Sequence, residues 1–322
     1  QLKSKLVTKT VRTISGIASI SIMTKPYGCP HGKCTFCPGG PNSAFGDVPQ
    51  SYTGREPATM RAIRNDFDPY LQVFSRLEQY AVTGQDFDKV ELIIQGGTFP
   101  WMPISYQDEF IAYAYKAMND FSLEFFSNNS SSSRSEIGEL EIKKYKAFFE
   151  MPGKLQDAER VERVKAKMLQ LKNPGAAANN EDIEAFLLQQ QKLNETAKIR
   201  CIGLTIETKP DWGRLEHGNQ ALKLGCTRVE LGIQSVYEQP LKLTNRGHTL
   251  KDTKESMQQL KDLGFKINAH YMLGLPATTR EMDLAGLKEL FENPDYRPDM
   301  LKIYPCLVIK GTPLFIQWQR GQ

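Results

Sequence analysis

The sequence has few of the features that mark membrane, secreted or disulfide-bonded proteins. No apolar run approaches the roughly 18 residues that a membrane-spanning helix needs, and no secretory signal pattern opens the chain. Only six cysteines occur among 322 residues, and three of them are scattered, so they do not form a disulfide framework. We therefore expect a cytoplasmic protein that is not associated with a membrane.

The charge is unevenly distributed along the chain. Residues 1–64 contain nine basic and two acidic side chains, which gives this segment a net charge of +7. Because the whole chain carries +4, residues 65–322 carry −3. A basic segment favours a polyanionic partner such as a nucleic acid. Charge alone is equally compatible with ordinary solvated lysine and arginine side chains.

The densest group of potential metal ligands follows the first β-compatible run. Cys29, Cys34 and Cys37 lie within nine residues, in the loop CPHGKCTFC. Three thiolates at this spacing can hold a four-iron, four-sulfur (4Fe-4S) cluster and leave one iron open to a small molecule. Zinc is the alternative, with His31 or a distant residue as the fourth ligand. The spacing favours iron–sulfur, because zinc sites more often combine two separated ligand pairs.

Strand-like and helical segments alternate through most of the chain. Short apolar runs predict strands at 16–23, 89–95, 122–126, 201–207, 228–234, 266–273 and 301–305. Helical patterns occur at 59–80, 106–119, 155–171, 182–193, 215–224, 250–263 and 280–291. Such alternation predicts a parallel sheet with right-handed crossovers. We expect an α/β fold, a partial (open) TIM-like barrel of about six β/α units, with its chemistry at the carboxyl ends of the strands.

Other parts of the chain depart from this alternation. We expect a basic amino-terminal segment at 1–16, the barrel at 17–306, and the beginning of a linker at 307–322. Within the barrel, residues 128–198 form a predicted helical insertion that contains the low-complexity run NNSSSSRS. This insertion either covers the mouth of the barrel or is an outer helical hairpin with no ligand role.

A glycine pair and several polar residues come directly after predicted strands. Gly96 and Gly97 follow the second strand, where a glycine pair lets a ligand approach the backbone closely. Glu207 and Gln234 end later strands, and Arg246 follows soon after. Each signal is weak alone, because polar residues at strand ends are commonly only hydrated. We expect these residues to meet on one rim of the barrel, at the carboxyl ends of the strands. Together, a carboxylate, an amide and a guanidinium can hold the polar groups of an amino-acid nucleoside.

His270 and the three scattered cysteines are expected to be structural, whereas His217 and His248 are not assigned a role. His270 lies inside a predicted strand, where a histidine is more often a hydrogen-bonded interior residue than a catalyst. Cys201, Cys226 and Cys306 lie in or beside apolar strands. We expect these thiols to behave as small buried hydrophobic side chains.

Together, these motifs resemble the radical S-adenosylmethionine superfamily, which combines clustered cysteines after the first strand with a Gly-Gly motif after the second. The run from Ile233 to His248 is similar to the branch that contains oxygen-independent coproporphyrinogen oxidase. From about Ser21 to Thr312 the chain more closely resembles the family of the catalytic subunit of Elongator. The segments that carry this resemblance are CPGGPNSAFGDVPQSYTGREPATMRAIRNDFDPY, LIIQGGTFP, IGLTIETKPD, CTRVELGIQSVYE, TNRGH and KIYPCLVIKGTPL.

The resemblance implies a radical enzyme of the acyltransferase class that modifies the wobble uridine of tRNA at carbon 5. In that family the cluster reductively cleaves S-adenosylmethionine, and a 5′-deoxyadenosyl radical starts carbon–carbon bond formation with an acetyl group from acetyl-CoA. The product is a carboxymethyl-type group. The implied cofactors are a 4Fe-4S cluster and S-adenosylmethionine, with acetyl-CoA in the full-length protein. The implied partners are the tRNA anticodon loop and Elongator-like proteins or a second copy of the chain.

The resemblance also implies roles for individual residues. Those expected to hold the cluster are Cys29, Cys34 and Cys37. Those expected to bind S-adenosylmethionine are Gly96, Gly97, Glu207, Gln234 and Arg246. Those expected to contact tRNA are Lys9, Arg12, Lys33, Arg61, Arg64, Lys209 and Arg228, of which Lys209 and Arg228 are equally suited to the acetyl group or to rim structure. No residue is given a catalytic role.

Two features depart from the family pattern. Four residues separate the first two cysteines, a longer gap than is commonest in the superfamily. Family members also carry a carboxy-terminal acetyltransferase-like domain after a short linker, whereas this chain ends at Gln322, just past the predicted barrel. We therefore expect this polypeptide alone not to complete acetyl transfer.

Two other classes of function are open. In the first, the protein is a non-catalytic RNA-binding scaffold whose cluster or zinc ion only staples the loop. Cys34→Ser would then lower stability without removing any cofactor-dependent activity. In the second, the protein is a radical enzyme that acts on a porphyrin or another small molecule, and competition by tRNA would distinguish this possibility.

Overall fold

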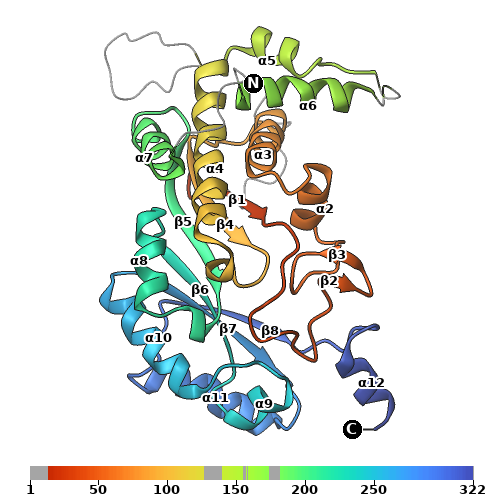
Figure 1. Cartoon of the computed structure of the whole chain (residues 1–322), viewed down its shortest axis with the longest axis vertical. Coiled ribbons are helices and arrows are strands. Elements are labelled where there is room, and N and C mark those ends of the chain that lie inside the picture. Colours follow the sequence, from red (N-terminus) through yellow and green to blue (C-terminus); the bar gives the residue numbers. More distant parts are fainter. Residues whose placement is uncertain (1–13, 127–139, 155–156, 158, 174–181, 322) are drawn as a thin grey trace. The chain divides into compact units, whose positions relative to one another are not determined.

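The computed structural model describes residues 14–126, 140–154, 157, 159–173 and 182–321. Lys9, Arg12 and the low-complexity run at 128–135 lie outside these residues. Six strands pair in the order β1-β4-β5-β6-β7-β8 and form the open, partial α/β barrel that the alternating pattern predicted (Figure 1). The strands are β1 (Ala18–Met23), β4 (Lys89–Gln95), β5 (Arg200–Thr208), β6 (Arg228–Gln234), β7 (Lys266–Leu273) and β8 (Met300–Pro305).

The register of the last four strands decides which side chains meet. Glu207 of β5 lies opposite Glu230 of β6, and Glu230 lies opposite Asn268 of β7. His270 of β7 lies opposite Lys302 of β8. Since alternate residues of a strand share one face, this register places acidic and basic side chains on a common face of the sheet.

The chain divides into two compact units, and the division falls within β1, β4 and β5. Unit 1 comprises residues 1–20, 68–92 and 108–202, and unit 2 comprises residues 21–67, 93–107 and 203–322. The helices of unit 1 are α3 (Pro69–Thr83), most of α4 (Ile104–Phe125), α5 (Ile142–Phe148), α6 (Glu159–Lys172) and α7 (Ile183–Asn194). The last two match helices predicted for the insertion.

An aromatic cluster fills the core of unit 1. The ring of Phe74 of α3 contacts those of Phe121, Phe125 and Phe149 in tilted or edge-to-face geometry, at centroid distances of 5.0–6.2 Å. The predicted strand at 122–126 is therefore wrong, because α4 continues as a 22-residue helix to Phe125. Phe121 and Phe125 are four residues apart and so point to the same side of a helix, where both rings are fully buried.

Unit 2 contains the carboxyl ends of the strands and the remaining helices. These helices are α2 (Pro57–Arg64), α8 (Leu215–Lys223), α9 (Glu238–Leu243), α10 (Leu250–Asp262), α11 (Arg280–Glu292) and α12 (Pro313–Gln319). A short antiparallel hairpin, β2 (Gly40–Ser43) and β3 (Gly46–Val48), follows the cysteine loop. The sequence did not predict this hairpin, α5, α9 or α12.

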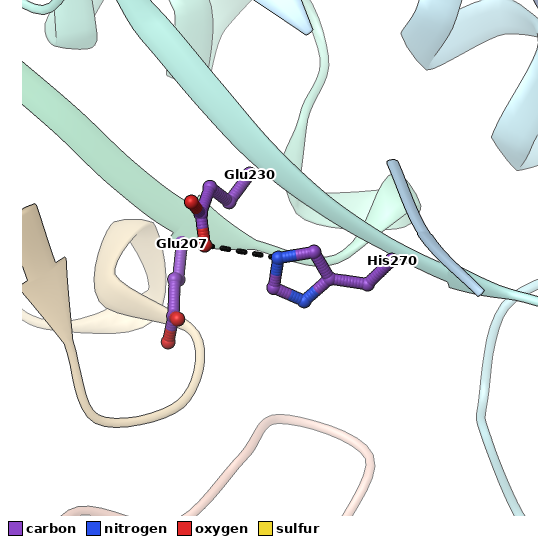
Figure 2. Close-up of side chains that lie close together, drawn as sticks. All are labelled: Glu207, Glu230 and His270. Atoms are coloured by element: carbon purple, nitrogen blue, oxygen red, sulfur yellow. Dashed lines mark hydrogen bonds and ion pairs between the residues drawn. The ribbon is translucent and has the colours of Figure 1, made fainter. Parts of the chain in front are cut away.

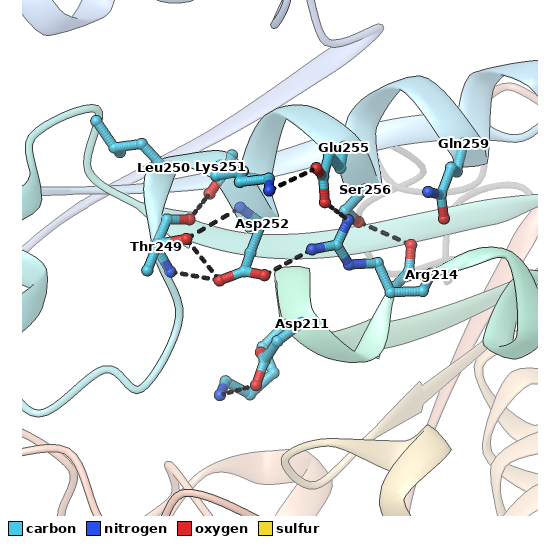
Figure 3. Close-up of polar contacts among 12 residues, drawn as sticks. Asp211, Arg214, Thr249, Leu250, Lys251, Asp252, Glu255, Ser256 and Gln259 are labelled. Atoms are coloured by element: carbon cyan, nitrogen blue, oxygen red, sulfur yellow. Dashed lines mark hydrogen bonds and ion pairs between the residues drawn. The ribbon is translucent and has the colours of Figure 1, made fainter.

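A polar clamp joins the amino-terminal ends of α8 and α10 (Figure 3). Arg214, the residue before α8, donates hydrogen bonds to Asp252 and Glu255 of α10. Asp252 also accepts hydrogen bonds from the backbone N–H and the hydroxyl of Thr249, both at 2.7 Å. The Thr249 hydroxyl in turn accepts from the Asp252 N–H, which completes a capping box at the start of α10.

We expect Thr249→Ala to lower the free energy of unfolding by about 1 kcal/mol, because it leaves helix N–H groups without their cap. Urea denaturation followed by circular dichroism measures this change. Thr83→Ala is the matched control, since the Thr83 hydroxyl only hydrogen-bonds carbonyls in the last turn of α3 and its loss should cost less than about 0.5 kcal/mol. Equal losses in the two variants would contradict a capping role.

Candidate functional site

The cysteine loop is held in place by backbone hydrogen bonds to distant parts of unit 2. It follows β1, and Thr24 donates its N–H to Gln95 O at the end of β4. Within the loop, the N–H of Cys37 donates to Cys34 O at 3.0 Å. The Thr35 N–H donates to Thr244 O, just after α9, and the Asn245 side chain donates to Lys33 O. These contacts place the loop over the carboxyl ends of the strands.

All three predicted cluster ligands line one cavity of about 390 Å³, which lies within unit 2. Cys34 and Cys37 are almost fully buried, with 4% and 3% of their surface exposed. The other residues predicted from the sequence that line this cavity are Gly97, Lys209, Glu207, Gln234 and Arg246. The structure thus brings together residues that are separated by more than two hundred positions in the sequence.

Polar groups surround each of the three sulfur atoms. The Thr98 hydroxyl donates to Cys29 Sγ at 3.6 Å, and Gln50 Nε2 donates to Cys37 Sγ at 3.3 Å. Cys34 Sγ lies 3.2 Å from His31 Nε2 and 3.7 Å from Arg246 Nη1. Every sulfur therefore lies within reach of a group that can stabilise a thiolate or a metal-bound sulfur.

Burial dominates the acid–base properties of this end of the cavity. It raises the pKa of Cys29 and of Cys37, so these thiols must release protons to bind a metal. Burial, together with the positive charges of Lys209 and Arg246, lowers the pKa of His31 to about 3. His31 is therefore neutral at physiological pH.

The two glycines after β4 have different surroundings. Both adopt positive φ angles, 127° for Gly96 and 112° for Gly97, which side chains rarely permit. A Cβ on Gly96 would lie 2.4 Å from the Thr24 hydroxyl, so this glycine is required by packing beneath the cavity. A Cβ on Gly97 would lie 2.9 Å from Gln50 Cβ and 3.7 Å from Cys29 Sγ. Only Gly97 lines the cavity.

The predicted polar residues Gln234 and Arg246 already form hydrogen bonds with other groups of the chain. Gln234, with φ 65°, accepts a hydrogen bond from the Tyr304 hydroxyl at 2.7 Å. Arg246 donates to Gly232 O at 2.7 Å. Its Nε is one of the buried polar atoms that lack a partner in the described part of the chain. Such an atom indicates a site where a bound polar group would be favourable.

Lys209 lies in the wall of the cavity and not on an open surface. Its side chain is only 1% exposed, and Nζ donates to Asp211 Oδ2 at 2.8 Å. Burial lowers the pKa of this ammonium group, while the contact with Asp211 opposes the shift. Lys209 is therefore part of the cavity wall, with its ammonium group paired to Asp211.

Four other basic residues predicted to contact tRNA are among the described residues, and none of them lines this cavity. Arg61 donates to Ser21 O at 2.7 Å, and Lys33 donates to Pro38 O at 3.3 Å. Arg228 is the first residue of β6 and so lies at the amino-terminal ends of the strands, whereas the cavity lies at their carboxyl-terminal ends. Arg64 is exposed at the end of α2. The structure does not gather these four residues into one site.

A polar network that the sequence did not predict forms another part of the cavity wall. Glu230 accepts hydrogen bonds from His270 and Lys302, and Glu207 lies close to both Glu230 and His270 (Figure 2). Glu207 itself accepts from Tyr52 at 3.3 Å and from Gln95 at 3.2 Å. The available signal was the alternation of side chains along β6, because Glu230, Gly232 and Gln234 share one face of the strand and all line the cavity.

The two carboxyl groups of this network differ in their acid–base properties. Burial raises the pKa of Glu207. Burial would also raise the pKa of Glu230, but the hydrogen bonds from His270 and Lys302 and the positive charge of Lys302 outweigh this effect and lower the pKa of Glu230. Neighbouring carboxyl groups whose pKa values are driven apart are typical of functional sites.

Comparison with known proteins identifies relatives of the whole chain. A model described as the radical SAM superfamily matches residues 156–286. The chain is 47% identical over 314 residues to the tRNA uridine(34) acetyltransferase of Methanocaldococcus infernus, covering 98% of this chain and 47% of that protein. It is 39% identical over 327 residues to Elongator complex protein 3 of Saccharomyces cerevisiae, covering 100% of this chain and 48% of that protein.

A solved structure agrees with these sequence relatives. The archaeal Elp3 of Methanocaldococcus infernus, determined with an amino-terminal deletion, superimposes with a TM-score of 0.63 at 36% identity. The match covers 95% of this chain and 49% of that one. The chain thus spans about half the length of the curated relatives it matches. Within the described residues, we find no helix with the length and apolar character needed to cross a membrane.

Proposed function

Since the chain belongs to the radical S-adenosylmethionine superfamily and shares its ancestry with Elongator complex protein 3 and the tRNA uridine(34) acetyltransferases, we propose that it is the radical core of a wobble-uridine-modifying enzyme. The observation that carries this proposal is the single cavity that unites three free thiols with Gly97, Glu207 and Arg246. A cluster ligand set and a set of polar groups for an amino-acid nucleoside thus face the same space.

The arrangement of the thiols in the sequence supports a cluster over a single zinc ion. The three cysteines that line the cavity come from one short loop, whereas zinc sites more often combine two separated ligand pairs. A 4Fe-4S cluster needs only three protein thiolates, each of which binds its own iron.

The surroundings of the thiols fit bound groups as well. Arg246 Nε and His31 Nδ1 are buried atoms without a partner in the described part of the chain. Cys34, Cys29 and Cys37 would hold the cluster, and Gly97 would let the methionine part of S-adenosylmethionine lie against the backbone. Arg246, Glu207 and Gln234 would hold its polar groups. The bound cluster and S-adenosylmethionine would supply a 5′-deoxyadenosyl radical that starts carbon–carbon bond formation at uridine C5.

The residues of the chain bind, orient and shield the reactants. The cysteine loop and the strand ends line the cavity from opposite parts of the sequence. Lys209 and Arg246 place positive charge beside Cys34, where negative charge gathers when the thiolates bind metal. The substrate base must leave its stack to enter such a cavity, which an anticodon loop permits. Acetyl-CoA would supply the carbon substituent in the full-length protein.

Anaerobic reconstitution of the full chain tests this function. We expect bound iron and sulfide, an iron–sulfur absorption spectrum, and cleavage of S-adenosylmethionine to 5′-deoxyadenosine and methionine under a strong reductant. We also expect tRNA binding that weakens about tenfold or more between low and moderate salt, because contacts to phosphates release counterions. Cluster-loaded protein that cleaves no cofactor, with or without tRNA, would overturn the proposal. Stoichiometric zinc in place of iron would do the same.

A further inference from the structure

Glu230 is the centre of a hydrogen-bond network to which the proposed function assigns no role. Its side chain is only 4% exposed. Its Oε2 accepts from His270 Nε2 at 2.9 Å and from Lys302 Nζ at 2.7 Å. Its Oε1 accepts from Asn268 Nδ2 at 3.2 Å. Three donors from β7 and β8 therefore converge on one carboxylate of β6.

These contacts determine the tautomer of His270. An ionised carboxylate has only acceptor atoms, and the low pKa of Glu230 keeps it ionised. His270 Nε2 must therefore carry the proton that is shared with Glu230. In the neutral imidazole, Nδ1 is then an acceptor with a free lone pair. It lies on the ring edge away from the Glu230 contact (Figure 2) and has no hydrogen-bond partner among the described residues.

The network presents a defined pattern of hydrogen-bonding groups to the cavity. His270 and Lys302 both line the cavity. Lys302 has three N–H donors, of which the contact with Glu230 uses one. The cavity wall therefore offers one acceptor, His270 Nδ1 on β7, and the remaining N–H donors of Lys302 on β8. His270 and Lys302 lie opposite each other in the strand register.

A divalent cation is a poorer occupant of this wall. Glu207, Glu230 and His270 offer atoms within 4.8 Å of one another, which is close enough for a shared metal ion. However, the Glu230 carboxylate already forms an ion pair with Lys302 Nζ at 2.7 Å. A metal ion would have to share this carboxylate with the ammonium group or displace it. The network therefore favours a neutral ligand with both donor and acceptor groups.

We propose that His270 and Lys302 recognise the Watson–Crick edge of uracil and thereby distinguish uridine from cytidine; this inference rests on the proposed function. Uracil presents N3–H as a donor beside the O4 acceptor. His270 Nδ1 would accept from N3–H, and Lys302 would donate to O4. Cytosine presents a lone pair at N3 and an amino group at position 4, so both contacts would become repulsive. A site built around such hydrogen bonds rejects an analogue that cannot make them.

Competition binding tests this inference with two anticodon stem-loop RNAs that differ only in uridine or cytidine at the wobble position. The cluster-loaded full chain is measured with S-adenosylmethionine present. We expect the wild type to prefer the uridine RNA by at least about tenfold. His270→Phe should remove this preference, because it keeps a ring but has no acceptor, whereas His270→Gln should restore part of it through its amide oxygen. His217→Gln, on α8, is the matched control and should keep the full preference.

Glu230→Gln tests the role of the tautomer. The amide of glutamine can donate to His270 Nε2, which would move the ring proton to Nδ1 and present a donor to the base. We expect this variant to lose or invert the preference for uridine while the total RNA affinity, which depends mainly on phosphate contacts, changes little. Nitrogen-15 spectra of the four histidines, assigned by single substitutions, report the tautomer directly. In the wild type, we expect the His270 proton on Nε2.

The outcomes separate this inference from the proposed function. Failure of cofactor cleavage and of tRNA binding would overturn the proposed function. If both occur but wild type and His270→Phe bind the two RNAs with the same ratio, the proposed recognition is wrong and the function stands. A wild-type His270 that carries its proton on Nδ1 would also overturn it. So would tight binding of Mn²⁺ that Glu230→Gln abolishes.

Discussion

Cys34→Ala is expected to abolish cluster binding and reduce the cleavage of S-adenosylmethionine to background. Cys34 is the middle ligand of the loop, and its sulfur lies between His31 Nε2 and Arg246 Nη1. Arg246 cannot replace the thiolate on iron, since arginine stays protonated and has no acceptor atom. Iron and sulfide content, visible absorption and 5′-deoxyadenosine formation measure the loss after anaerobic reconstitution.

Cys201→Ala is the control for this substitution. Cys201 is half-buried near the beginning of β5 and does not line the cavity. We expect this variant to bind iron and cleave the cofactor as the wild type does. A Cys34→Ala protein with a full complement of iron would contradict the ligand assignment. If the wild type binds zinc, and Cys34→Ala loses stability but no activity, the metal-stapled scaffold is the better description.

Gly97→Ala is expected to weaken S-adenosylmethionine binding at least about tenfold while the cluster is retained. The new Cβ would lie 2.9 Å from Gln50 Cβ, on the wall of the cavity. Gln50 donates to Cys37 Sγ, so its displacement would disturb both the backbone surface and one sulfur. The φ angle of 112° adds strain of about 1–3 kcal/mol for any side chain. Isothermal titration of the cluster-loaded protein measures the affinity.

Gly46→Ala separates the effect of strain from the effect of space. Gly46 has a positive φ of 83°, but a Cβ there would meet no atom within 4 Å. This variant should lose stability of about 1–2 kcal/mol for the same conformational reason, yet bind S-adenosylmethionine normally. If Gly46→Ala weakens cofactor binding as much as Gly97→Ala does, general destabilisation explains both results and Gly97 has no direct role.

The alternating pattern was sufficient to predict the barrel, because each of its six strands is a short apolar run bounded by polar or glycine-rich turns. The strand predicted at 122–126 was wrong for a physical reason. Its aromatic residues favour strands in isolation, but Phe121 and Phe125 instead join the aromatic core of unit 1. Local propensity could not reveal that core, since Phe74 and Phe149 come from distant segments.

The candidate site was predictable where a motif is local in the chain. Each predicted feature lies within a few positions of the end of a predicted strand: the cysteine loop, the glycine pair, Glu207 and Gln234. The structure then separated the glycines, since only Gly97 lines the cavity. It also placed Lys209 in the cavity wall and Arg228 at the amino-terminal end of β6, away from the cavity. The roles proposed for these residues still await the experiments above.

The amino-acid sequence by itself determined the place of the cysteine loop after the first strand, the six strands of the barrel and the superfamily, since all three depend on residue types at short spacing. Only the tertiary structure decided that Glu230, His270 and Lys302 form one network. A single strand shows which of its own residues share a face, but the register between strands decides which neighbours meet. That register is set by backbone pairing between strands. It cannot be predicted from the residues of any single strand.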